Sequence, residues 1–181
     1  EYADPHLNLG LQLLMQGRWA EAWPEFEWRW RTPQMEPFRR PFVEPQWDGS
    51  LQLDATLLVH AEQGLGDTLN FIRYAPLAAE RVGQRVLESQ PSLVPWLAGM
   101  EGIDAVVART EELPPFDVHV PLLSLPGIFG TTPETVPRVG PSLRPPAGIH
   151  VPLPAGDGLK VGLVWAGNPR NPFDPSRTAG L

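Results

Sequence analysis

The stretch that decides the fold is Leu57-Leu-Val-His-Ala-Glu-Gln-Gly-Leu-Gly-Asp-Thr-Leu-Asn-Phe-Ile-Arg-Tyr-Ala75. Its apolar beginning predicts a buried strand over residues 56–60. A turn with two glycines follows at residues 64–66, and Asp67 or Thr68 is then placed to cap a helix. Apolar side chains recur at helical spacing beyond that point, so the stretch predicts a strand, a glycine turn and a helix in direct succession.

A glycine turn between a strand and a helix is the place where α/β sheets bind ligands. The glycines let the backbone approach closely, and the helix start offers unpaired N–H groups and a positive dipole end. Glu62 and Asp67 add two carboxylates to this turn. Binding an anion does not need them, so they indicate a base or a hydroxyl acceptor, and chemistry on an alcohol. The competing interpretation is a tight connection whose glycines serve the backbone alone.

The turn does not match the common nucleotide-binding motifs. Leu69 stands three residues after Gly66, where the dinucleotide fingerprint requires a third glycine. No Gly-Lys-Ser or Gly-Lys-Thr follows, so the turn is not a Walker loop either. The local motif alone therefore identifies no nucleotide.

Strand and helix signals alternate after the first strand. Further strands are predicted at residues 85–88, 105–108 and 118–120. Helices are predicted at residues 68–81, 92–98 and 122–125. This alternation is typical of an α/β protein with a mostly parallel sheet and right-handed crossovers. We therefore assign residues 51–155 to a Rossmann-like domain.

Residues 1–32 predict a helical hairpin, because apolar side chains recur at helical spacing on both sides of Gly17. Its length fits one tetratricopeptide unit of about 34 residues. One such unit cannot bury its own apolar face, so it needs further repeats or contact with the next domain. Five of the seven tryptophans lie in the first 50 residues. They either fix the hairpin to the next domain or form a platform on which sugars stack.

Two segments join the predicted domains or begin a new one. Residues 33–50 are rich in proline and predict an extended linker over the surface, with Arg39 and Arg40 in solvent. Residues 156–181 predict the start of a second α/β domain, with its first strand at residues 160–165. A complete second domain needs further residues, so we expect the chain as given to be inactive alone.

Composition excludes several functional classes. Apolar residues make up 42% of the 181, enough for a core, and no run reaches the length of a membrane span. No basic segment followed by an apolar one marks a signal peptide, which points to a cytoplasmic protein. The absence of cysteine excludes disulfides and thiolate metal sites. The net charge of −7 without a basic patch argues against nucleic acid as a partner.

Several motifs occur in an order found in one known group of bacterial proteins. The turn Glu62-Gln-Gly-Leu-Gly-Asp67 is followed by Phe71-Ile-Arg-Tyr-Ala-Pro-Leu77. The other pieces are Leu9-Gly10, Gly17-Arg-Trp-Ala-Glu-Ala-Trp-Pro-Glu-Phe-Glu-Trp-Arg-Trp30, Pro45-Gln-Trp-Asp-Gly49, Leu113-Pro-Pro-Phe-Asp-Val-His-Val-Pro-Leu-Leu-Ser-Leu-Pro126 and Val161-Gly-Leu-Val-Trp-Ala-Gly-Asn168. Together they resemble tetratricopeptide-repeat proteins with a domain similar to heptosyltransferases, glycosyltransferase family 9. The resemblance extends more distantly to O-linked N-acetylglucosamine transferases, and it covers nearly the whole chain.

The resemblance implies a GT-B fold of two facing α/β domains. The acceptor then lies mainly on the first domain and the nucleotide-sugar donor mainly on the second. It also implies inverting transfer of a sugar to a hydroxyl of a glycan, lipid or protein, with no metal and no further cofactor. Asp67 matches the aspartate that acts as general base in the family. A helix cap is the alternative role for the same side chain.

The remaining site residues are predicted on the turn, at a strand end and on the donor loop that the resemblance implies. The expected acceptor-binding residues are Glu62, Gln63, Gly64, Gly66 and His119, with Glu62 favoured as the residue that orders the turn. The expected donor-phosphate residues are Asn168, Arg170, Ser176 and Arg177, on the loop after the first donor-domain strand. Pro172 and Pro175 depart from the polar run usual in that loop.

Asp117 and His119 lie two apart on a predicted strand, so they share a face and suggest either an acid–base pair or a structural role. No histidine has metal-ligand spacing with an acid cluster, so no metal site is predicted. Three functions stay open: a glycosyltransferase, a catalytically silent sugar-binding or protein-interaction scaffold built on helical repeats, and a different nucleotide-dependent enzyme on the same frame.

Overall fold

The computed structural model describes residues 2–138, 143, 145–146, 148, 152–153 and 155–163. The chain divides into two compact units, Glu1–Pro146 and Ala147–Leu181. Every helix and strand of the described residues belongs to the first unit. The strand expected at residues 160–165 is not formed over residues 160–163, and the rest of it lies outside the described residues.

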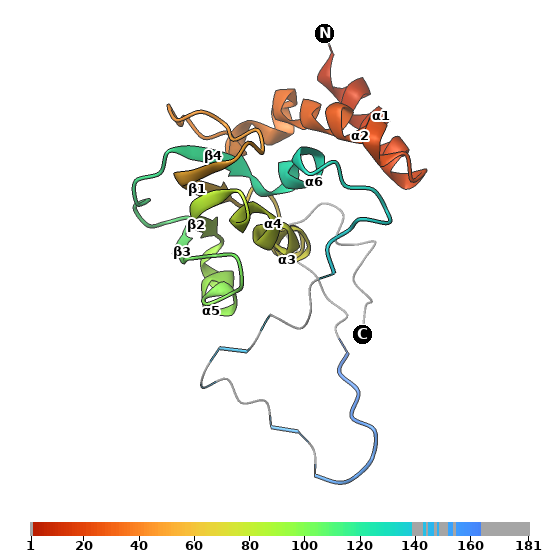
Figure 1. Cartoon of the computed structure of the whole chain (residues 1–181). Coiled ribbons are helices and arrows are strands. Elements are labelled where there is room, and N and C mark those ends of the chain that lie inside the picture. The colour runs from red at the N-terminus through yellow and green to blue at the C-terminus, as the bar shows by residue number, and fades with distance from the viewer. Residues whose placement is uncertain are drawn as a thin grey trace. The chain divides into compact units, whose positions relative to one another are not determined.

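The first unit is built on a parallel sheet of four strands (Figure 1). The strands are β1 (Gln52–His60), β2 (Val82–Ser89), β3 (Ala105–Ala108) and β4 (Val118–Pro121). Their order is β3-β2-β1-β4, and every neighbouring pair is parallel. The chain moves outward from β1 to β3 and then returns to the other side of β1. The order reverses at β1 and β4, which is where α/β sheets of this kind place ligands.

Short helices connect the strands. They are α3 (Leu65–Phe71), η3 (Ile72–Tyr74), α4 (Ala75–Ala79), η4 (Pro91–Leu93) and α5 (Val94–Leu97), followed after β4 by η5 (Leu122–Ser124) and α6 (Leu125–Ile128). The single helix predicted at residues 68–81 is thus three consecutive elements. Pro76 explains the break, because it has no N–H to donate to the carbonyl of Ile72 four residues earlier.

The main core lies on one face of the sheet. Leu57 and Val59 point to this face and belong to one buried cluster with Tyr74, Ala75 and Leu97 of α5. Leu58 and His60 point to the opposite face, because side chains alternate along a strand. That opposite face is approached by Phe42 from the linker, whose ring lies 5.5 Å from the His60 ring.

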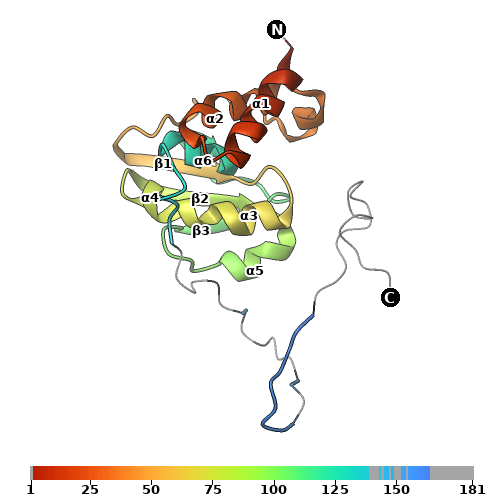
Figure 2. The same cartoon turned by 90° about the vertical axis from the view of Figure 1, so that its right-hand side faces the viewer.

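The N-terminal segment forms the expected helical hairpin, with α1 (Ala3–Met15) and α2 (Trp19–Phe26). Gly10 permits their close contact, because a Cβ there would lie 2.8 Å from the Phe26 nitrogen. The hairpin lies at the β4 edge of the sheet, and α5 lies at the β3 edge (Figure 2). Trp23 is buried in the main core, and its indole donates to the Thr131 carbonyl at 2.7 Å. This supports the interpretation that tryptophans fix the hairpin to the domain.

The first part of the linker differs from the extended form that its prolines predicted, whereas residues 39–50 contain no helix. After η1 (Glu27–Arg31), residues Pro33–Phe38 form the 3-10 helix η2, with Pro33 at its first position. A proline fits there, because the first helical N–H has no partner within the helix. Arg40 was expected in solvent, but this prediction is wrong. Its guanidinium lies 2.5 Å from a carboxylate oxygen of the buried Glu88.

Candidate functional site

The helix after β1 begins at Leu65, three residues earlier than the sequence suggested. Gly64 is the residue before the first helical position, and Asp67 is the third residue of α3. The Asp67 carboxylate accepts a hydrogen bond of 3.0 Å from the Gly64 N–H. The prediction that Asp67 or Thr68 is the N-cap residue is therefore wrong, because Gly64 holds that position. Asp67 lies within the first turn of the helix, and its side chain binds the N–H of the N-cap residue.

The end of β2 holds this turn in place. The Gln90 side chain donates to the Gln63 carbonyl at 2.8 Å and accepts from the Thr68 hydroxyl at 3.0 Å. Thr68 is buried and Gln63 half-buried, whereas Gly64 and Gly66 are exposed. The turn is thus fixed by the side chain of the residue that follows β2, and its glycines face solvent.

Glu62 is buried within the protein, with 1% of its surface exposed. Its carboxylate accepts from the Arg29 guanidinium at 3.0 and 3.3 Å and from the Leu123 N–H at 3.0 Å. Burial raises the pKa of Glu62, and the charge and hydrogen bonds of Arg29 oppose that rise. These contacts match the ordering role favoured for Glu62 and leave it away from the solvent-facing side of the turn.

Arg29 forms a buried hub that the sequence analysis missed. Besides Glu62, its guanidinium donates to the Ser124 hydroxyl at 2.8 Å and to the Glu27 carboxylate at 2.6 Å. The hub links η1, the turn after β1 and η5. In the sequence, Arg29 is marked only by its place in the tryptophan-rich segment after α2. Arginines are also common on exposed helix surfaces, so this place alone did not indicate a buried residue.

His119 contacts a second histidine. The His60 Nε2 lies 3.2 Å from the His119 Nδ1, where the two side chains share one face of the sheet. Burial lowers the pKa of His60 to about 3, and the neighbouring His119, Arg40 and Arg109 contribute. Burial also lowers the pKa of His119. Both rings are therefore neutral at physiological pH.

The acid–base pair that the spacing of Asp117 and His119 left open, beside the structural role, is not formed. The Asp117 carboxylate instead accepts from the Thr56 N–H at 2.8 Å, where β1 and β4 begin to pair. Asp117 is exposed and His119 half-buried. The sequence correctly placed Asp117 and His119 at β4. The Asp117 carboxylate, however, binds a backbone N–H of the neighbouring strand β1.

A buried carboxylate at the end of β2 was also missed. Glu88 lies between two arginines, with Arg40 at 2.5 Å and the Arg109 Nε at 3.8 Å. Arg109 additionally donates to the Ala61 carbonyl. These contacts tie the linker to the carboxyl end of β2, and the loop after β3 to the carboxyl ends of β2 and β1. Both arginines come from segments far from Glu88 in sequence, so no local pattern indicated them.

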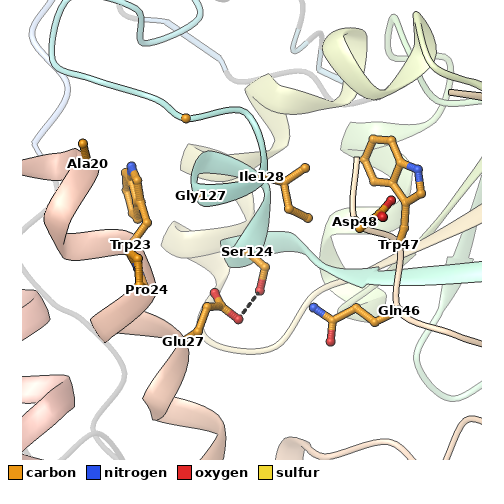
Figure 3. Close-up of a pocket in the computed structure, with 11 residues that line it drawn as sticks. Ala20, Trp23, Pro24, Glu27, Gln46, Trp47, Asp48, Ser124, Gly127 and Ile128 are labelled. Atoms are coloured by element: carbon orange, nitrogen blue, oxygen red, sulfur yellow. Dashed lines mark hydrogen bonds between the residues drawn. The ribbon is translucent and has the colours of Figure 1, made fainter. Parts of the chain in front are cut away.

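A pocket of about 610 Å³ lies between the hairpin and the sheet domain (Figure 3). Trp23, Pro24 and Glu27 line one side, and Gln46, Trp47 and Asp48 line the facing side. The remaining lining residues are Ala20, Ser124, Gly127, Ile128 and Gly130. None of the residues predicted for acceptor binding lines this pocket.

The predicted donor-phosphate residues Asn168, Arg170, Ser176 and Arg177 lie outside the described residues. Within the part of the chain that the structure describes, no three His, Asp or Glu side chains come together as metal ligands. None of the helices in that part has the length and apolar character needed to cross a membrane.

The described part of the chain is an α/β protein whose four-stranded parallel sheet is compatible with a Rossmann-like fold. Comparison with models of known families, with curated proteins and with solved structures found no significant match.

Proposed function

We propose that the protein is a glycosyltransferase of the GT-B type, and that the first unit binds the acceptor. The reaction transfers a sugar from a nucleoside-diphosphate sugar to a hydroxyl, with inversion at the anomeric carbon. The observation that carries the proposal is the place of the turn from Glu62 to Asp67. It follows β1 directly, where the strand order reverses between β1 and β4.

Asp67 is the residue proposed as general base. It is half-buried, and one carboxylate oxygen is bound to the Gly64 N–H. The other oxygen, Oδ1, accepts no hydrogen bond from the described residues, which leaves a lone pair for a substrate hydroxyl. As the acceptor oxygen attacks the anomeric carbon, its proton passes to Asp67 and the nucleoside diphosphate leaves with the electrons of the broken bond.

The rest of the turn orients that carboxylate. Gln90 fixes the turn through Gln63 and Thr68, while Glu62 fixes it from the other side through Arg29. Exposed glycines at 64 and 66 let an acceptor approach the backbone. In this proposal Glu62 orders the site and does not exchange protons with substrate.

The test is a donor screen on the full-length protein. Thermal-shift measurements with UDP-, GDP- and ADP-sugars identify the donor, and donor hydrolysis or transfer then reports activity. Stabilisation by one nucleotide class, followed by turnover that Asp67→Asn abolishes, would support the proposal. No stabilisation by any donor, together with no turnover, would reject it.

A catalytically silent scaffold is the second candidate, and one observation favours it. The bond from Gly64 to Asp67 already gives that carboxylate a structural role at the start of α3. A scaffold needs nothing more from the residue. In that case Asp67→Asn would leave ligand binding unchanged, and no donor would be consumed.

A further inference from the structure

The pocket between the hairpin and the sheet domain has a wall of carbon atoms. The indole N–H groups of Trp23 and Trp47 are already bonded, to the Thr131 carbonyl at 2.7 Å and the Ser50 carbonyl at 3.0 Å. Trp47 is 1% exposed and Trp23 8%, so the apolar surface that a ligand reaches comes mainly from Pro24 and Ile128, with a small part from the Trp23 ring. A ligand of this pocket needs an apolar face.

Polar groups sit beside that wall. Gln46 and Asp48 reach it from the linker, and Glu27 faces them from the end of α2 (Figure 3). Ser124 lies between, where its hydroxyl donates to Glu27 at 3.1 Å and accepts from Arg29. A purely apolar ligand would remove water from these groups without replacing their hydrogen bonds, which is unfavourable.

The charge of the lining selects against anionic ligands. Its charged residues are Glu27 and Asp48, both acidic, so the lining repels phosphates and other anions. Arg29 lies 2.6 Å from Glu27 but also pairs with the buried Glu62, so its single charge does not neutralise both carboxylates. The exposed Asp48 adds a further negative charge. A cation is therefore the competing ligand, for which choline is the probe.

The hydrogen-bonding groups of the lining favour a ligand rich in hydroxyls. The carboxylates and the amide oxygen of Gln46 accept, the Gln46 amide N–H groups donate, and the Ser124 proton is already donated to Glu27. Acceptors outnumber donors, so the ligand must supply protons, and hydroxyl groups, which both donate and accept, match this set. The volume of about 610 Å³ falls within the range of small-molecule sites.

We infer that this pocket binds a neutral saccharide, with the C–H face of a sugar ring on the Trp23 and Ile128 side and its hydroxyls donating to Asp48, Gln46 and Glu27. The inference goes beyond the proposed transfer reaction and does not depend on it. The lining contains no residue of the turn that carries Asp67. Binding here is measurable whether or not that turn is catalytic.

The experiment is saturation-transfer NMR and calorimetry on the full chain. The neutral probes are cellobiose, lactose and N,N′-diacetylchitobiose. Choline is the cationic probe and glucose 6-phosphate the anionic one. At least one neutral disaccharide is expected to bind, and the charged probes are not. Failure of all three disaccharides, or preferential binding of choline or glucose 6-phosphate, overturns the inference.

Substitutions locate the binding. Ala20 is exposed on α2 and lines the pocket, so Ala20→Trp fills it while leaving the core intact. Affinity should fall about tenfold or more. Met15→Trp is the matched control, because Met15 is 81% exposed on α1 and outside the lining. Equal affinity in both variants, with unchanged melting temperatures, would place the sugar elsewhere and reject the pocket.

A third variant separates a sugar from a cation. Asp48→Asn keeps an oxygen that can accept from the Ser50 N–H, now at 2.9 Å, and from a hydroxyl. Disaccharide affinity should fall by at most about fivefold, the scale of one hydrogen bond. A much larger loss would indicate that the carboxylate charge itself binds the ligand, against a neutral saccharide. Asp67→Asn should leave disaccharide affinity unchanged, so loss of transfer and loss of this binding remain separable.

Discussion

The Arg29 guanidinium donates to both carboxylate oxygens of Glu62, at 3.0 and 3.3 Å, with both side chains almost completely buried. The pair joins the segment after the helical hairpin to the turn after β1. Buried ion pairs are costly to break, because removal of one partner leaves the other charged and without compensation. This contact therefore links η1 directly to the turn, in addition to the apolar packing of the hairpin on the core.

Arg29→Met should destabilise the protein by about 3–5 kcal/mol, the usual effect of breaking a buried pair. The pKa of Glu62, already raised by burial, should rise further without the arginine. Urea unfolding measures the first effect. The double variant Arg29→Met with Glu62→Gln should recover part of the loss, because no buried charge then remains.

Arg18→Met is the control for that experiment. Arg18 pairs with Glu21 at 2.6 Å on the exposed surface of α2. Solvent screening makes such pairs weak, so its free energy of unfolding should hardly change. Equal destabilisation by both arginine variants would contradict the special role of the buried pair.

Asp67→Asn should reduce transfer by about 100-fold or more, the scale of losing a general base, with little change in stability. The asparagine oxygen can still accept from the Gly64 N–H, so the start of α3 is kept. Turnover with the identified donor and the melting temperature are the two measurements. Asp54→Asn, an exposed carboxylate on β1, serves as control.

Two outcomes of the Asp67 experiment would count against the base. Near-full transfer at an unchanged melting temperature would show that the proton goes elsewhere. Parallel loss of stability and transfer would show that the capping contact is the main role of Asp67.

His60 should make the protein less stable in mild acid. Its pKa is about 3 when folded and near 6.5 when unfolded, so the unfolded chain binds the extra proton between these values. Stability due to His60 is present above pH 6.5 and is lost as the pH falls towards 3. His119, whose pKa is also lowered, acts in the same direction. Glu62, whose pKa is raised, acts in the opposite direction above pH 4.5.

The unfolding free energy at pH 5 and pH 7.5 measures this dependence. His60→Asn should reduce the difference between the two values, by at most about 1.4 kcal/mol for each pH unit below 6.5. Proton NMR should show the His60 ring untitrated down to about pH 4. A His60 midpoint near 6.5 would contradict the burial that causes the shift.

Gly10→Ala should destabilise the hairpin by about 1–3 kcal/mol, the range for overpacking. The added methyl would lie 2.8 Å from the backbone nitrogen of Phe26, which cannot move without separating α1 from α2. Thermal or urea unfolding reports the loss. A stability equal to wild type would mean that the helices are not in such close contact.

Gly66→Ala is the matched comparison. Nothing lies within 4 Å of a Cβ at this position, and its backbone does not require glycine. The protein should be unchanged or stabilised by up to about 1 kcal/mol. If Gly66→Ala folds normally but weakens acceptor binding, the glycine serves the approach of a ligand. Destabilisation would instead show that the backbone of the turn needs the glycine.

Local patterns in the sequence were sufficient for most of the fold. The predicted strand at 105–108 has the bounds of β3, and the other three predicted strands fall within β1, β2 and β4. Alternation of strands with helical segments correctly gave a parallel sheet. The period of apolar side chains is a local property, and so it can be read from neighbours in the chain.

Local signals were less reliable where two of them competed. Pro76 divided a predicted helix, and Pro33 began a 3-10 helix in a segment expected to be extended. At the turn, the residue types were right, but Asp67 caps from the third helical position. The N-cap and the third helical position both favour polar side chains such as Asp. The residue type alone therefore does not show which of the two positions Asp67 occupies.

The sequence by itself determined the α/β alternation and the acidic glycine turn after the first strand. Only the tertiary structure decided the partners of the charged side chains: Arg29 with Glu62, 33 residues apart, and Arg40 with Glu88, 48 apart. It also decided that Asp117 binds the Thr56 N–H rather than His119, and that Trp23 and Trp47 enclose a pocket. The reason is physical. Periodicity follows from backbone geometry within a few residues, whereas an ion pair or a pocket depends on which distant segments the fold brings together.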